Sequence, residues 1–102
     1  VICTSQGKPC FLNEHLSRLY ASASGISLEI PNTSKEIKEQ IQNTLNSADN
    51  HESYIRIIVT RGIGEVDIDP SSCLNPNIII FVKGIPQIPA ESYRKGVSIA
   101  LV

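Results

Sequence analysis

Two apolar segments, residues 53–61 and 77–83, constrain the fold of this chain more than any other feature. Both are rich in β-branched and aromatic side chains, which favour strands. The run IIIFV at 78–82 has no polar side chain, so we predict a strand that is buried on both faces. Residues 62–76 contain two glycines and two prolines and are predicted to form the loop between the two strands.

Two helices are predicted before these strands. Residues 13–24 start with Asn13, a good N-cap, carry leucines at helical spacing and end before the stop signal Gly25. Residues 33–46 start with a Thr-x-x-Glu capping box, after which isoleucine and leucine recur at intervals of four. Each helix therefore has one apolar face that must pack against another layer.

The two ends of the chain are predicted to form further strands. Residues 1–12 are predicted as an extended hairpin with its turn at residues 7–9, Gly-Lys-Pro. Residues 97–102, VSIALV, are predicted as a last strand after Gly96. The predicted order is strand, helix, helix, strand, strand, strand. This order is typical of an α+β fold with an antiparallel sheet and two helices packed on one side.

Length and composition limit the class of protein. With 102 residues the chain holds one domain at most. Its formal net charge of −1 argues against a nucleic-acid or polybasic membrane partner, because both need clustered positive charge. No apolar run reaches the ~20 residues of a membrane span, so we expect no membrane partner and a cytoplasmic location. The chain has no methionine and both ends fall in predicted strands, so we expect a domain that is incomplete at both ends.

The three cysteines, Cys3, Cys10 and Cys73, form no closely spaced C-x-x-C pair. Such pairs are typical of zinc sites, so we predict no metal site in this chain. We interpret the three side chains as reduced, partly buried thiols, which is the usual state of cysteines in a cytosolic protein.

Arg56 lies in the middle of the first apolar strand, and Tyr54 shares its face because side chains alternate along a strand. An unpaired guanidinium is too costly to bury, so Arg56 must be exposed, paired with a carboxylate or bound to an anion. The residues alone leave a structural role and anion binding open. On the same grounds Arg18 of the first helix is a solvated arginine, and His15 is a hydrogen-bonded structural histidine.

Two longer motifs carry a resemblance to a known family. Residues 11–23, FLNEHLSRLYASA, resemble the F-x-L-x-E-H-x-x-R-L-x-x-S-A segment of class IV aminotransferases, which are pyridoxal-phosphate enzymes of fold type IV. Residues 54–56, YIR, followed by VTRGIG at 59–64, resemble the Y-I-R…T-R-G-x-G segment of the same family. The matches lie in order and at the expected separations over nearly the whole chain.

The resemblance implies a role for three side chains. Arg18 occupies the position of the arginine that contacts the cofactor phosphate, and a planar guanidinium suits that dianion. Tyr54 and Arg56 occupy positions that help to recognise the substrate carboxylate in branched-chain aminotransferases. The implied cofactor is pyridoxal 5'-phosphate, and the implied substrates are an amino acid and a 2-oxo acid.

The resemblance also implies that residues 1–102 are the small N-terminal domain of a two-domain enzyme, with the active site between it and a larger C-terminal domain. The lysine that holds the cofactor in this family would lie beyond residue 102, and none of the chain's own lysines matches its context. We therefore expect no catalytic residue in this chain, no activity of the chain alone, and a homodimer as the assembled enzyme.

Three activities occur within the family that the chain resembles. The Y-I-R motif favours branched-chain aminotransferases, which transfer the amino group of a branched-chain amino acid to 2-oxoglutarate. D-amino-acid aminotransferases tend to place an arginine in the loop after T-R-G, whereas residues 63–70 contain no Arg or His. Aminodeoxychorismate lyases usually have a Lys-containing strand instead of Y-I-R. A non-catalytic α+β binding module is the alternative from another class of protein.

Overall fold

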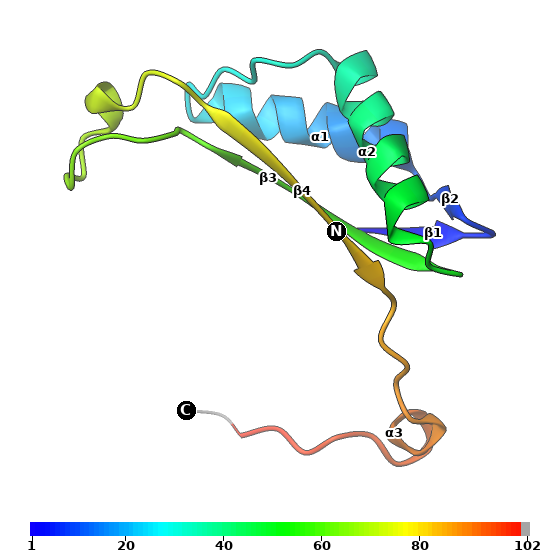
Figure 1. The fold of residues 1–102 in the computed structure, drawn as a ribbon. Coiled ribbons are helices and arrows are strands. Elements are labelled where there is room, and N and C mark those ends of the chain that lie inside the picture. The colour runs from blue at the N-terminus through cyan, green and yellow to red at the C-terminus, as the bar shows by residue number, and fades with distance from the viewer. Residues whose placement is uncertain (101–102) are drawn as a thin grey trace.

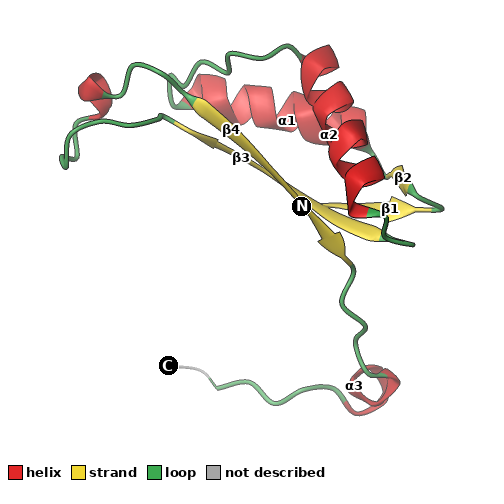
Figure 2. Cartoon of the chain, viewed as in Figure 1, coloured by secondary structure: helices red, strands yellow, loops and turns green. Residues whose placement is uncertain are grey.

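The computed structural model describes residues 1–100. Its elements, in chain order, are β1 (Ile2–Ser5), β2 (Lys8–Pro9), α1 (Leu12–Gly25), α2 (Ser34–Ala48), β3 (Ser53–Thr60), the 3₁₀ turn η1 (Pro70–Ser72), β4 (Asn77–Gly84) and α3 (Ala90–Lys95), as Figure 1 shows. The strands form one antiparallel sheet in the order β2-β1-β3-β4. Helices α1 and α2 lie on the same face of this sheet (Figure 2). The predicted α+β fold, with two helices on one side of an antiparallel sheet, is confirmed.

The core lies between these two helices and the sheet. It consists of five side chains that are at most 3% exposed: Ile2, Leu16, Ile37, Ile41 and Ile55. Burying one such side chain contributes about 1.5–3 kcal/mol relative to leaving it exposed, so this cluster holds the helices on the sheet.

The starts of the two long helices differ in how well the sequence predicts them. The capping box of α2 is confirmed: the Glu36 N–H donates to the Thr33 hydroxyl at 3.3 Å, and the Thr33 N–H donates to the Glu36 carboxylate at 2.7 Å. The prediction of Asn13 as the N-cap of α1 is wrong. The helix begins at Leu12, and the preceding Phe11 has φ 51° and makes no side-chain cap. This left-handed residue turns the chain directly from the hairpin into α1.

The β1–β2 hairpin turns at Gln6 and Gly7, whose φ angles are 52° and 71°. Two positive φ angles are characteristic of the type I′ turn that joins strands with a two-residue loop. The turn predicted at 7–9 is therefore one residue too late. Pro9 lies in β2 opposite Thr4, at a position where the ladder needs no N–H donor.

Glu52, immediately before β3, fastens the hairpin to the rest of the sheet. Its carboxylate accepts hydrogen bonds from the Thr4 hydroxyl and from the N–H groups of Gln6 and Gly7, the latter two at 2.5 and 3.4 Å. The Thr4 hydroxyl in turn accepts from the Ser53 N–H at 2.7 Å. The hydrogen bond from Thr4 is the main reason that the pKa of Glu52 is lowered.

Strand β4 is covered on one face only, so the prediction of a strand buried on both faces is wrong. Ile78, Ile80 and Val82 pack against the core, whereas Ile79 and Phe81 are 41% and 53% exposed on the other face. The reason is that α1 and α2 lie on the same side of the sheet, and the chain after β4 extends away from the opposite side (Figure 1).

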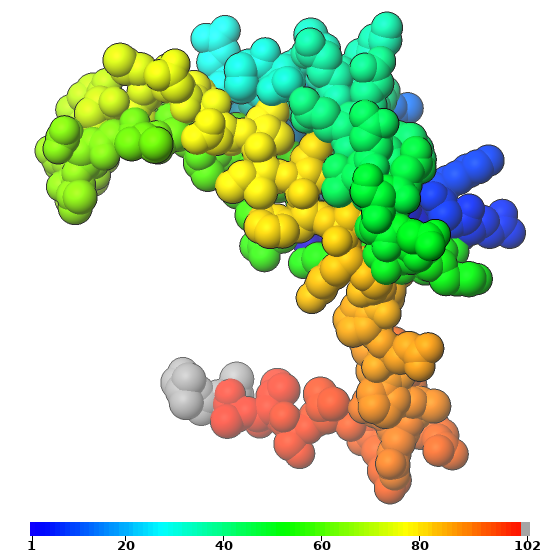
Figure 3. Space-filling view, in the orientation of Figure 1, coloured from blue at the N-terminus to red at the C-terminus, as the bar shows by residue number. Residues whose placement is uncertain are grey.

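The strand predicted for residues 97–102 is wrong for residues 97–100, which have no regular secondary structure, while residues 101–102 lie outside the described residues. The short helix α3 was not predicted from the sequence. Figure 3 shows this end of the chain extending from the body, and the Cα radius of gyration is 17.2 Å, against about 13 Å for a compact chain of this size. Val97 and Ile99 are exposed and find no neighbouring strand within residues 1–100.

None of the helices within residues 1–100 has the length and apolar composition needed to cross a membrane.

Candidate functional site

Arg18 is exposed on α1 and borders a hollow of about 150 Å³. The other walls of the hollow come from the start of the chain, α1 and β3: Val1, Ile2, His15, Leu19, Ser22 and Ile57. Arg18 Nη2 lies 3.1 Å from Nδ1 of His15, one turn earlier on the same helix. Because a guanidinium can only donate, Nδ1 accepts this bond and the ring proton lies on Nε2. The prediction of a hydrogen-bonded histidine is confirmed, and its partner is Arg18.

Within residues 1–100 the positive charge of Arg18 has no carboxylate partner. The only ion pair within residues 1–100 joins Lys95 to Glu91 at 2.5 Å, on α3. Glu14 lines a second hollow beside Arg18 but does not approach it within ion-pair distance. An exposed guanidinium next to a hollow, held by one neutral neighbour, suits a phosphate group, because its fork geometry matches two phosphate oxygens.

Tyr54 and Arg56 lie on the uncovered face of the sheet, which we call the open face. In the register of β3 and β4, Tyr54 lies opposite Lys83 and Arg56 opposite Phe81. The Lys83 ammonium is 5.4 Å from the centroid of the Tyr54 ring, within the range of a cation–π interaction. Arg56 itself is exposed and makes no ion pair within residues 1–100, so an intradomain carboxylate does not explain its presence.

The sheet separates Arg18 from the other two candidate residues. Arg18 lies on the helix side beside Ile57, while Tyr54 and Arg56 lie on the open face, and none of the described hydrogen bonds joins the two sides. Arg18 and Arg56 nevertheless both lie near the edge of β3 that faces the start of the chain. Ile2 pairs with Ile55, so the same register brings Val1 beside Arg56. Beyond this point, no strand in the described part of the chain pairs with this edge of β3.

Arg61 is a residue whose role the sequence analysis did not assign, although it is part of the Thr-Arg-Gly motif. Its guanidinium donates to the carbonyl of Ile26 and, at 3.4 Å, to that of Ser27. These carbonyls follow α1, where cationic side chains satisfy free acceptors and complement the helix dipole. Arg61 therefore ties the end of β3 to the end of α1.

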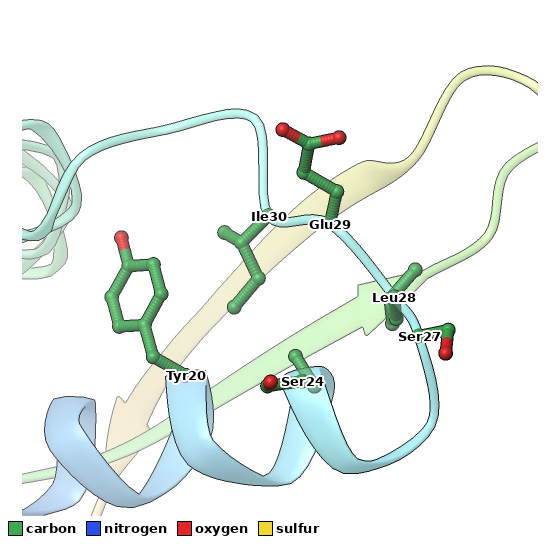
Figure 4. A pocket seen from close by; sticks show the side chains of 7 residues that line it. Tyr20, Ser24, Ser27, Leu28, Glu29 and Ile30 are labelled. Carbon is green, nitrogen blue, oxygen red and sulfur yellow. The ribbon is translucent and has the colours of Figure 1, made fainter.

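A larger hollow of about 470 Å³ lies between α1 and the connector of residues 26–30 (Figure 4). Tyr20, on its border, donates its hydroxyl proton to the Asn32 carbonyl at 2.5 Å, and partial burial followed by the Glu36 charge raises its pKa. The side chains that line this hollow include Glu29 but no Lys or Arg. It is therefore less suited to an anion than the hollow beside Arg18.

The structure thus describes an α+β fold in which Arg18 and Arg56 are exposed and make no ion pair within residues 1–100. The sequence model of the family described as "Amino-transferase class IV" matches residues 1–102, which is the whole chain. The chain therefore belongs to the class IV aminotransferase family.

Two kinds of relatives within this family are similar to the chain. A protein of Methanocaldococcus jannaschii named "Putative branched-chain-amino-acid aminotransferase" is 32% identical over 90 residues, which is 88% of this chain and 31% of that protein. A "D-alanine aminotransferase" of Listeria monocytogenes is 35% identical over 63 residues, which is 62% of this chain and 22% of that protein. The chain thus spans about a third or less of the length of these relatives.

Proposed function

We propose that residues 1–102 form the small N-terminal domain of a two-domain, pyridoxal-phosphate-dependent aminotransferase that acts on an amino acid and a 2-oxo acid. The observation that supports this most strongly is the family match over all 102 residues. The domain then contributes binding groups, while the larger C-terminal domain and the partner subunit of a homodimer complete the active site.

In this proposal Arg18 holds the cofactor phosphate. The exposed fork, its hollow and the lack of a carboxylate partner within residues 1–100 all fit a phosphate dianion. His15 orients the fork by accepting one of its N–H groups, which leaves the others free for phosphate oxygens. When bound, pyridoxal phosphate supplies the electron sink for amino-group transfer.

Tyr54 and Arg56 bind the substrate carboxylate in this proposal. They share the open face, and neither side chain makes a hydrogen bond or ion pair within residues 1–100. Lys83 adds a second positive charge close to Tyr54. A face with two cations and a phenol is suited to a carboxylate, because each contact is a charge-assisted hydrogen bond or an ion pair.

We propose a branched-chain amino acid and 2-oxoglutarate as the substrates. The Y-I-R motif and the first relative named above support this choice. A D-amino-acid aminotransferase is the second candidate, because a relative named for D-alanine matches 63 residues. The absence of Arg and His from residues 63–70 favours the first candidate. An aminodeoxychorismate lyase is less favoured because Y-I-R replaces its Lys-containing strand.

The experiment uses the whole protein that carries residues 1–102, loaded with pyridoxal phosphate. We expect transamination of L-leucine, L-isoleucine or L-valine with 2-oxoglutarate, and a kcat/KM for D-alanine that is lower. Borohydride reduction and peptide mapping should then place the cofactor on a lysine outside residues 1–102. The domain assignment would be overturned if the cofactor were attached to one of the chain's own lysines. These are Lys8, Lys35, Lys38, Lys83 and Lys95. Preference for D-alanine would reject the branched-chain assignment alone.

A further inference from the structure

Cys3 and Cys10 lie opposite each other across the β1–β2 hairpin. The register pairs Thr4 with Pro9, and directly after the end of β2 the Cys10 N–H donates a 2.9 Å hydrogen bond to the Cys3 carbonyl. Opposed residues of antiparallel strands have Cα atoms about 4.5–5.5 Å apart, so this hydrogen bond makes the two cysteines close neighbours across the hairpin. Disulfides need a Cα separation of about 4.4–6.8 Å, a range that includes the usual spacing of opposed residues in antiparallel strands.

The two thiols differ in exposure in a way that suits sequential oxidation. Cys3 is exposed on the open face, directly opposite Tyr54 of β3, whereas Cys10 is half-buried. An oxidant in solution therefore reaches Cys3 first, and Cys10 is the nearer second thiol. Cys73 belongs to the loop between β3 and β4, which Figure 1 shows at the opposite end of the sheet from the hairpin.

The position of the two cysteines in the hairpin is fixed by contacts that do not involve their side chains. The type I′ turn fixes the loop, and Glu52 fastens Thr4 and the turn to the start of β3. A bridge between Cys3 and Cys10 would therefore form between two backbone segments that other contacts already hold side by side. A pair that is accessible and held in register by other contacts can be oxidised and reduced reversibly.

We propose that Cys3 and Cys10 form a redox-active dithiol pair that hydroperoxides oxidise to an intramolecular disulfide. In the first step the Cys3 sulfur attacks a peroxide oxygen and the O–O bond breaks, which converts Cys3 to a sulfenic acid. With hydrogen peroxide as the oxidant, one water leaves in this step. Cys10 sulfur then attacks the Cys3 sulfur, the S–O bond breaks and the S–S bond forms. The second water carries away the remaining oxygen. The two sulfurs together lose two electrons, the peroxide gains two, and both thiol protons end in water.

The test is peptide mapping of the whole protein after treatment with hydrogen peroxide and then iodoacetamide. Trypsin cleaves poorly between Lys8 and Pro9, so both cysteines stay on one peptide that ends at Arg18. We expect this peptide to lose two hydrogens and to resist alkylation, and dithiothreitol to restore alkylation at both positions. Cys73→Ser is the matched control and should leave this result unchanged.

The variants Cys3→Ser and Cys10→Ser separate the two steps. Without Cys10, Cys3 should stop as a sulfenic acid that dimedone traps, whereas without Cys3 the peptide should not form a dimedone adduct at Cys10 under the same conditions. The proposal is overturned if both cysteines of the parent protein stay open to alkylation after peroxide. It is equally overturned if either one bridges to any other cysteine, or if Cys3 proceeds to sulfonic acid while Cys10 remains a thiol.

Discussion

Replacing Arg56 by glutamine tests the proposed substrate role directly, because the structure separates that role from a structural one. The guanidinium is exposed and forms no ion pair within residues 1–100. Its removal should therefore change the free energy of unfolding by no more than about 0.5 kcal/mol, as for most exposed substitutions. In a domain of this size that corresponds to a shift in Tm of less than about 4 °C.

The effect of Arg56→Gln on kcat/KM for the substrate should be much larger than its effect on stability. Loss of one charge-assisted hydrogen bond to a carboxylate costs about 1.5–3 kcal/mol, which lowers kcat/KM by roughly 10- to 150-fold. The visible absorption of the bound cofactor should persist, since Arg56 lies on the opposite face of the sheet from Arg18. Steady-state kinetics, the absorption spectrum and Tm should be measured on the same preparation.

Arg61→Gln is the matched control for this substitution. Arg61 directly follows β3, and its guanidinium donates to the carbonyls of Ile26 and Ser27. Its loss should lower the free energy of unfolding by about 1–2 kcal/mol and leave the KM for substrate nearly unchanged in the folded fraction. If Arg56→Gln instead lowers Tm as much as Arg61→Gln does and keeps the parental kcat/KM, the substrate role of Arg56 is refuted.

Two further substitutions test the cofactor site and the hairpin. Arg18→Ala should weaken cofactor retention by about 1.5–3 kcal/mol, whereas Ser17→Ala, also exposed on α1, should not; equal rates of cofactor loss on dialysis would make Arg18 an ordinary surface residue. The Glu52→Gln variant should have a lower free energy of unfolding than the parent protein, and the difference should be largest near neutral pH. The hydrogen bond from Thr4 lowers the pKa of Glu52 below its ordinary 4.5 in the folded protein, so its stabilisation is present above about pH 4.5 and is lost as pH falls through the folded pKa. The measurement is the free energy of unfolding of parent and variant at several pH values between 7 and 3. A difference between the two proteins that stays constant over this range would contradict this account.

Elements with a local physical signal were predictable from the sequence. The long helices and the strands β3 and β4 lie within two residues of their predicted ends, because apolar periodicity, the capping box and β-branched runs each act over a few neighbouring residues. The start of α1 was not predictable in this way. Its position depends on a single left-handed residue, Phe11, and an aromatic residue gives no sequence signal for positive φ.

Features that depend on pairing between distant segments could not be predicted from the sequence. The IIIFV run indicates burial on both faces, but the exposure of Ile79 and Phe81 depends on where α1 and α2 dock. The strand-like residues 97–100 lack a pairing partner in the described range, and β composition alone cannot supply one. The cation–π contact of Lys83 with Tyr54 follows from the register of two strands separated by a long loop, which no local pattern specifies.

The positions of Arg18 and Arg56 relative to one edge of the sheet connect the two halves of the proposed site. Arg18 approaches this edge from the helix side beside Ile57, and Arg56 lies on the open face beside Val1. A guanidinium needs a counter-charge wherever water is excluded, and within residues 1–100 neither arginine has one. A larger domain that covered this edge without bringing an anion would leave two desolvated positive charges. Docking of that domain and binding of a phosphate on one side and a carboxylate on the other should therefore favour each other.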